Sequence, residues 1–137
     1  MKIFIFLVLT LSLNVGRCEW IKFTQDDIKN DYFYEASKLT VTTYPEAKYV
    51  SGWIMMNYGK PFVMKNNKVI NSQKDNFQIN CKFKSNVEEY KLMFTAYYSG
   101  KNGTGGMTYQ NDYGFGLSQK IIPDSMVEYF VEYFCKM

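Results

Sequence analysis

The sequence predicts an all-β, mostly antiparallel fold, and three features of the chain lead to this prediction. Apolar and polar residues alternate with a period of two over residues 76–98. Short segments rich in β-branched and aromatic residues precede that stretch, and glycine, proline and asparagine separate them. Because side chains of a strand point alternately to opposite faces, this alternation indicates a sheet with one buried face. Short strands at regular spacing are typical of a small β-sandwich, which is the architecture we expect.

Two strands near the middle of the chain form the expected centre of the sheet. The apolar face of the first strand consists of Phe77, Ile79, Cys81 and Phe83. The second strand repeats the pattern, and its apolar face consists of Tyr90, Leu92, Phe94, Ala96 and Tyr98. The polar segment between them, residues 84–89, is typical of a connection. The centre is therefore predicted to be an antiparallel pair with a cysteine on its core side.

Shorter strands are expected before this pair, at residues 38–44, 49–58, 62–64 and 68–70. The Asn66–Asn67 pair tolerates a left-handed backbone, so it suits the tip of a hairpin. Residues 99–119 are rich in glycine and are expected to be mainly loop.

The N-terminal part of the folded region mixes charged and aromatic residues without a strict period. Thr24 and the Asp26–Asp27 pair are compatible with the start of a short helix, because Ile28 and Tyr32 lie at helical spacing. We therefore allow one short N-terminal helix in an otherwise β fold.

Residues 124–135 fit two structures. Ser125 and Glu128 have the spacing of a capping box, and the apolar positions 126, 127, 130, 131 and 134 share one helical face. The same segment, VEYFVEYFC, also alternates with a period of two, and its β-branched and aromatic content favours a strand. We predict a strand here and keep a helix as the alternative.

The N-terminus has the pattern of a secretory signal peptide. A single lysine is followed by an apolar run that ends at Leu13, which is shorter than the roughly 20 residues that span a bilayer. Small residues at Gly16 and Cys18 place the cleavage site after Cys18. We therefore predict a signal peptide over residues 1–18 and one secreted, extracellular domain over 19–137, without a transmembrane segment in the mature chain. A signal anchor is the alternative.

Cleavage would also change the charge and the cysteine count. Removing Lys2 and Arg17 from the 16 basic residues leaves 14 against 13 acidic ones, so no concentrated basic face for nucleic acid is expected. Two cysteines remain, Cys81 and Cys135, and in an oxidising compartment an even pair predicts a disulfide. Such a bond would stabilise the fold by about 4 kcal/mol, and it requires α-carbons within about 7 Å. Two buried free thiols are the alternative.

Asn102 begins the triplet Asn-Gly-Thr within the glycine-rich segment GKNGTGG. An Asn-x-Thr triplet on an exposed loop of a secreted protein is an acceptor for N-glycosylation. The sequence therefore predicts a glycoprotein with its sugar at Asn102.

The residue arrangements that commonly carry catalysis or bind metals are missing from the sequence. The chain has no histidine, which removes imidazole-based triads and the usual zinc sites. The adjacent carboxylates Asp26–Asp27 and Glu88–Glu89 would point to opposite faces of a strand, so neither pair converges as in a glycosidase. Asp112 lacks the alternating acidic partners of a calcium loop. We therefore predict a non-enzymatic protein without a metal or cofactor.

Aromatic residues are abundant, with 12 tyrosines, 11 phenylalanines and 2 tryptophans. A group of them flanks the glycine-rich segment and forms the candidate binding patch: Tyr97, Tyr98, Tyr109, Tyr113 and Phe115. Tyrosine suits recognition because it offers a large contact area and a polar tip. Ordinary packing of loops over one end of the fold is the alternative.

Four short motifs occur in a fixed order. Residues 50–61, VSGWIMMNYGKP, run from Val-x-Gly to Gly-Lys-Pro, and residues 77–79 read Phe-Gln-Ile. Residues 92–94 read Leu-Met-Phe, and residues 121–127 begin Ile-Ile-Pro. In this order the motifs resemble the nematode transthyretin-like family of small secreted β-sandwich proteins.

The chain departs from that family at several positions. Met56 stands where the family has a cysteine, Tyr58 is an additional residue, and Met126 replaces a tyrosine. The resemblance implies a secreted monomer without enzymatic activity, and it transfers no binding residues.

The sequence thus favours a secreted, disulfide-bonded binding protein whose partner is an extracellular or cell-surface protein, glycan or lipid. The alternative is a small extracellular carrier that encloses an apolar ligand in a lipocalin-like barrel. An exposed aromatic patch over a filled core would favour the first function, and an enclosed apolar cavity would favour the second.

Overall fold

The computed structural model describes residues 18–81 and 88–137. Its strands, in chain order, are β1 (Trp20–Gln25), β2 (Asp31–Glu35), β3 (Thr40–Thr43), β4 (Lys48–Val63), β5 (Val69–Cys81), β6 (Glu89–Tyr98) and β7 (Met107–Gln119). Two 3-10 turns, η1 (Ala36–Lys38) and η2 (Lys101–Gly103), and one α-helix, α1 (Met126–Cys135), complete the described elements. The predicted all-β class is confirmed.

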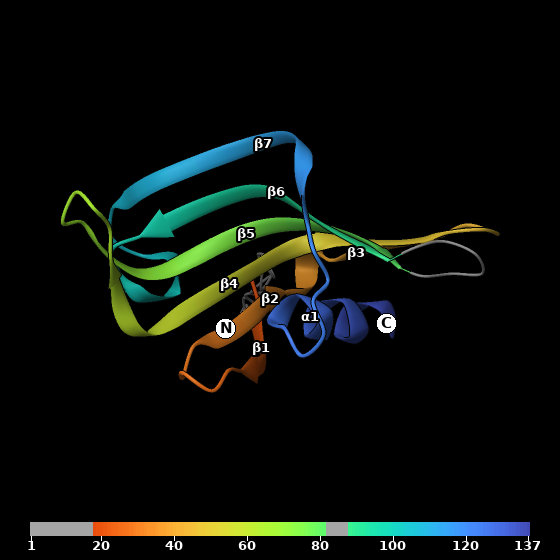
Figure 1. Cartoon of the computed structure of the whole chain (residues 1–137), viewed down its shortest axis with the longest axis horizontal. Helices are drawn as coiled ribbons and strands as arrows, with labels where there is room; N and C mark the ends of the chain where they lie inside the picture. Colours follow the sequence, from red (N-terminus) through yellow and green to blue (C-terminus); the bar gives the residue numbers. More distant parts are fainter. Residues whose placement is uncertain (1–17, 82–87) are drawn as a thin grey trace, which may run out of the picture.

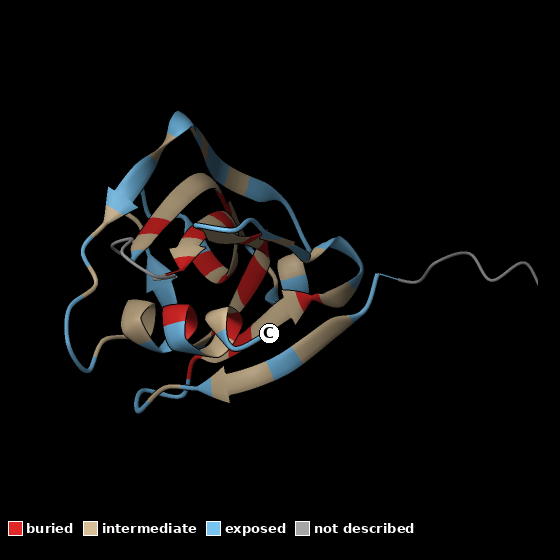
Figure 2. Cartoon of the chain, turned by 90° about the vertical axis from the view of Figure 1, so that its right-hand side faces the viewer, coloured by how far each residue is buried: buried red, intermediate tan, exposed pale blue. Residues whose placement is uncertain are grey.

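The strands form one antiparallel sheet in the order β1-β2-β4-β5-β6-β7 (Figure 1). Strand β3 is not part of this order and pairs with β4 alone. A sandwich would need two facing sheets. Here one sheet curves, and α1 lies inside the curve as the second layer (Figure 2). The strands are therefore antiparallel as predicted, and a helix takes the place of the second sheet.

The core lies between α1 and the concave face of the sheet. The helix contributes Phe130, Val131 and Phe134, which are almost fully buried. The rings of Phe134 and Phe77 lie 4.9 Å apart, so the helix packs directly on β5. Phe77, Ile79 and Cys81 share the buried face of β5, as their alternation predicts.

The prediction of a strand at residues 127–135 is wrong, because this segment belongs to α1. The Ser125 hydroxyl accepts a hydrogen bond from the Glu128 backbone amide at 3.3 Å, and Glu128 accepts one from the Asp124 amide. The Ser125 half of the predicted capping box is therefore present, whereas Glu128 accepts from Asp124, one residue before the N-cap. A helix also turns Phe130, Val131 and Phe134 towards the sheet together, whereas a strand would place Phe130 and Val131 on opposite faces.

The short N-terminal helix is also absent, because residues 26–30 form the turn between β1 and β2. The Asp26 carboxylate accepts hydrogen bonds from the Ile28 and Asn30 amides and from the Tyr32 hydroxyl. Burial raises the pKa of Asp26, but these hydrogen bonds outweigh it and hold the pKa below its usual value. An aspartate that caps its own turn competes with helix formation.

The regular alternation predicted for residues 90–98 is interrupted by a bulge. Phe77 pairs with Leu92, but the preceding residue Asn76 pairs with Phe94, so Met93 is an extra residue in β6. Beyond the bulge Thr95 and Tyr97, rather than Phe94 and Ala96, continue the concave face. A single extra residue reverses which side chains face the core.

Residues 1–17 of the predicted signal peptide, the end of the first predicted central strand with Phe83, and residues 84–87 of the predicted connection lie outside the described residues. In the remainder of the chain, no helix is both long and apolar enough to cross a membrane.

Candidate functional site

The concave face continues past the end of α1. Beyond the helix it carries six polar or aromatic side chains, which we call the open cluster: Tyr58, Gln73, Asp75, Thr95, Tyr97 and Tyr109. Strand register brings them together, since Gln73 pairs with Tyr97 and Tyr97 pairs with Tyr109. Paired residues of antiparallel strands lie on the same face, so four strands contribute to one continuous surface.

Hydrogen bonds connect the polar members of the open cluster. The Tyr58 hydroxyl donates to Gln73 Oε1 at 2.6 Å. The Gln73 amide donates to both carboxylate oxygens of Asp75, at 2.9 and 2.8 Å, and the Thr95 hydroxyl donates to Asp75 Oδ1 at 2.8 Å. All of these partners are uncharged. The carboxylate is therefore held by dipoles, which orient it without neutralising it.

Among the described acidic residues on this surface, Asp75 has the carboxyl whose pKa is most perturbed. Desolvation raises the pKa of its carboxyl to about 6, although the Gln73 and Thr95 hydrogen bonds oppose the change. Burial, followed by the Asp75 charge, raises the pKa of Tyr97 as well. The site can therefore change charge in mildly acidic conditions through a single carboxyl.

The aromatic members form a platform beside this carboxyl. The rings of Tyr97 and Tyr109 are stacked with centroids 5.5 Å apart, and 43 % of Tyr109 is exposed. Tyr113 lies close enough to Tyr97 to help raise its pKa, after burial and the Asp75 charge. The structure thus brings together three members of the predicted patch, Tyr97, Tyr109 and Tyr113.

The other two members of that patch lie elsewhere. Tyr98 is on the convex face, where the Lys74 ammonium lies 5.5 Å from its ring centroid and 5.3 Å from that of Trp20. Phe115 is 99 % exposed. It lies in a bulge of β7, because Leu117 pairs with Leu92 while Asp112 pairs with Phe94. Gly114 and Gly116 flank Phe115 with positive φ angles of 62° and 97°.

Sequence reasoning missed the polar half of the open cluster. Asp75 and Gln73 lie in phase with Phe77, Ile79 and Cys81, so extending the alternation towards the N-terminus would have placed a carboxylate and an amide on the core face. Thr95 could not be found in this way, because the Met93 bulge changes the phase of β6.

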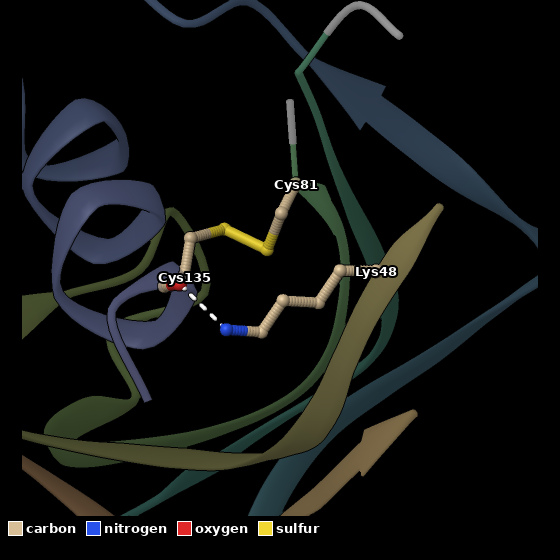
Figure 3. The surroundings of a disulfide bond; sticks show 3 residues. All are labelled: Lys48, Cys81 and Cys135. Carbon is tan, nitrogen blue, oxygen red and sulfur yellow. Dashed lines mark hydrogen bonds between the residues drawn. A yellow bond between two sulfur atoms is a disulfide. The ribbon is translucent and has the colours of Figure 1, made fainter. Parts of the chain in front are cut away.

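The disulfide lies at the end of the concave face that α1 covers, which we call the covered end. The structure joins Cys81 to Cys135, as the sequence predicts, with α-carbons 5.7 Å apart. The Lys48 ammonium donates to the Cys135 carbonyl at 2.8 Å (Figure 3). Both contacts attach the C-terminal end of α1 to the sheet.

Asn102, the predicted glycosylation site, is exposed on η2. Its Oδ1 accepts a hydrogen bond from Asn57 Nδ2 at 2.7 Å, and its backbone amide donates to Asn57 Oδ1 at 2.8 Å. The side-chain oxygen is thus engaged, and Nδ2 is the atom that would carry a sugar. Glycosylation stays a prediction.

Comparison with known proteins gives one match. The family model described as Surface-adhesin protein E matches residues 20–136. No curated protein and no solved structure matches the chain. The match covers all the described strands and α1, and it does not test the resemblance to transthyretin-like proteins, which stays a prediction.

Proposed function

The chain belongs to the Surface-adhesin protein E family, and from this premise we propose that it is a non-enzymatic adhesin that binds an extracellular or cell-surface partner through the open cluster. The observation that carries the proposal is that α1 covers one end of the concave face of the sheet and leaves the other end uncovered. The covered end is filled by α1, while the other end presents stacked tyrosines beside an oriented carboxylate and amide.

The composition of the open cluster suits recognition. Tyrosine rings supply contact area at little cost in side-chain entropy, and their hydroxyls remain able to exchange hydrogen bonds. Gln73 and Asp75 are already fixed by each other, so a partner would not have to order them on binding. Such a surface accepts a protein or a glycan that offers hydrogen-bond donors to Asp75.

The same geometry supports a function without catalysis. The hydrogen-bond partners of the Asp75 carboxylate are Gln73 and Thr95, and no cysteine or second carboxylate takes part in these hydrogen bonds. Within residues 18–81 and 88–137, no group of three or more potential metal-ligating side chains is placed to hold an ion. These observations support the proposal, and an activity screen would test it directly.

A carrier function would need an enclosed cavity. The sheet order runs from β1 to β7 without pairing these two edges in the described chain, so its strands do not form the lipocalin-like barrel that the alternative requires. The open cluster is a surface, which favours a partner large enough to lie across it.

The proposal is tested by binding assays with purified protein against panels of extracellular proteins and glycans. The variant Tyr97→Ala/Tyr109→Ala should weaken binding of any captured partner by at least about tenfold, because it removes the exposed aromatic platform. The matched control is Tyr44→Ala/Tyr49→Ala, which removes another aromatic pair, with centroids 6.2 Å apart, near β3. Equal losses in both variants, or none in the first, would contradict the proposal.

A further inference from the structure

The hairpin between β4 and β5 projects past the rest of the sheet (Figure 1). The register shifts after Asn57, and beyond the shift Phe62 pairs with Ile70 and Val63 with Val69. Met64 and Lys68 close the end of the hairpin with a 2.9 Å backbone hydrogen bond. Asn67 has a positive φ of 62° in this turn, as its residue type predicts.

This hairpin tip exposes apolar side chains that the core does not use. Phe62 is 50 % exposed, Val63 57 % and Val69 44 %. The Phe62 ring stacks on Tyr58 with centroids 6.3 Å apart, so it is held at the surface by its own strand.

A second apolar side chain lies beside the tip. Ile28, in the turn between β1 and β2, is 73 % exposed. Ile28, Pro61 and Phe62 help to line a groove of about 560 Å³. Gly59 permits this approach, since a Cβ there would lie 2.6 Å from the carbonyl oxygens of Ile28 and Lys29. The two turns therefore form one surface.

Within the hairpin, the charged residues that border the apolar tip are all cations. Lys60, Lys65 and Lys68 are exposed, and no acidic residue occurs from Gly59 to Lys74. Lys29 adds a further exposed cation from the neighbouring turn. Of the acidic residues of that turn, Asp26 is held by the turn itself. Asp27 is exposed next to Ile28, and these residues line a second groove against the N-terminal end of α1.

We propose that this hairpin tip docks end-on on an anionic lipid bilayer, with Phe62 on one face of the hairpin and Val63 on the other entering the boundary of the acyl chains and the lysines contacting lipid headgroups. Exposed apolar residues bordered by lysine are the features of interfacial membrane binding, which combines apolar burial with attraction to anionic lipid. A soluble polyanion would use the lysines but would gain nothing from the apolar side chains. The docking site adjoins the open cluster at Tyr58, which stacks on Phe62 and donates to Gln73, but it does not include Tyr97 or Tyr109 and so leaves the tyrosine platform available to a partner.

Vesicle sedimentation tests the proposal, using phosphatidylcholine vesicles with and without about 30 % phosphatidylserine. Lys65→Gln/Lys68→Gln should lower partitioning onto the anionic vesicles about 25-fold, at about fivefold for each lysine. Phe62→Ser/Val63→Ser should lower it by at least about tenfold, because less apolar surface leaves water. Each variant is compared with the unaltered protein, so any contribution of another segment to vesicle binding is present in both and does not affect the comparison.

Matched control variants carry the same changes elsewhere. Lys120→Gln/Lys136→Gln alters exposed lysines away from the tip, and Phe115→Ser/Leu117→Ser alters exposed apolar residues of β7. Both should partition like the unaltered protein. Phe62→Trp should also shift its fluorescence to shorter wavelength on anionic vesicles, whereas Phe115→Trp should not.

Two results would overturn membrane docking. One is equal loss in the tip variants and their controls. The other is binding to a soluble polyanion such as heparin that matches vesicle binding and is unaffected by Phe62→Ser/Val63→Ser. Neither result bears on partner binding, which the Tyr97→Ala/Tyr109→Ala variant reports separately.

Discussion

The two ends of the concave face are built from the same strands and differ in what covers them. At the covered end, Phe77 and Ile79 of β5 meet Phe134 and other apolar residues of α1. Two residues before Phe77 the same alternation reaches Asp75, and two further back it reaches Gln73. The change from apolar to polar residues coincides with the end of the helix.

This difference shows that a strand can serve two purposes without changing its geometry. Side chains under α1 are selected for packing, and side chains beyond it can be selected for contact with a partner. We therefore expect substitutions at the covered end to change stability, and substitutions at the open end to change binding or its pH dependence.

The largest expected effect lies under the helix. Phe134→Ala removes a fully buried ring that contacts Phe77, and it should lower the free energy of unfolding by up to about 5 kcal/mol. Tyr129→Ala, on the exposed side of the same helix, should lower it much less. Urea titration followed by circular dichroism measures both. Similar losses in the two variants would mean that α1 does not cover the core as described.

Removal of the disulfide should have the next largest effect. Cys81 and Cys135 are 54 residues apart in the chain, and a cross-link that closes a loop of this length is worth about 4 kcal/mol. Cys81→Ser/Cys135→Ser should lower the unfolding free energy by about that amount. Partner binding below the unfolding transition should change little, because the open cluster lies away from the bond. Alkylation of either cysteine in the native, unaltered protein would contradict the pairing.

Asp75→Asn should change how stability depends on pH. In the unaltered protein the pKa of Asp75 rises from 3.8 to about 6 on folding. The native state therefore binds the proton more tightly than the unfolded state. The resulting stabilisation is fully present below pH 3.8 and is lost as the pH rises through about 6. Relative to Asp75→Asn, the unaltered protein should lose up to about 3 kcal/mol between pH 4 and pH 7.

Asp26→Asn provides the opposite comparison for that measurement. The pKa of Asp26 is lowered on folding, so its contribution is present above the unfolded pKa and is lost as the pH falls through the folded one. The two variants should therefore diverge from the unaltered protein in opposite directions when unfolding is measured across the same pH range. Parallel curves for Asp75→Asn and the unaltered protein would exclude a shifted Asp75.

The covered end was the easier half to predict from sequence. Alternation over residues 76–81 identified the buried face of β5, and the even cysteine count identified the disulfide. The structure of residues 126–135 was not decided by the segment itself, because its apolar residues satisfy both periods. The concave sheet decides it, since only a helix can place Phe130, Val131 and Phe134 on that surface together.

The open end was harder to predict because its arrangement depends on bulges. The extra residue Met93 exchanges the faces of Tyr97 and Tyr98, so a patch chosen by proximity in sequence joined residues from both sides of the sheet. Phe115 was separated from the platform by the second bulge, in β7. A bulge follows from the pairing of two strands, and neither strand signals it alone.

The smallest expected effect on stability is at Phe115, in the β7 bulge beside the open cluster. Because this side chain is 99 % exposed, Phe115→Ser should change the free energy of unfolding by less than about 0.5 kcal/mol.

Gly114→Ala is the control for the bulge itself. A Cβ there meets no atom within 4 Å, but the φ of 62° should still cost about 1–2 kcal/mol. If both predictions hold in thermal unfolding, the backbone of the bulge is specified by its glycines and Phe115 itself is free to contact a partner. A loss at Phe115→Ser as large as that at Gly114→Ala would instead show that the ring packs on the protein, and the open end would then be smaller than described.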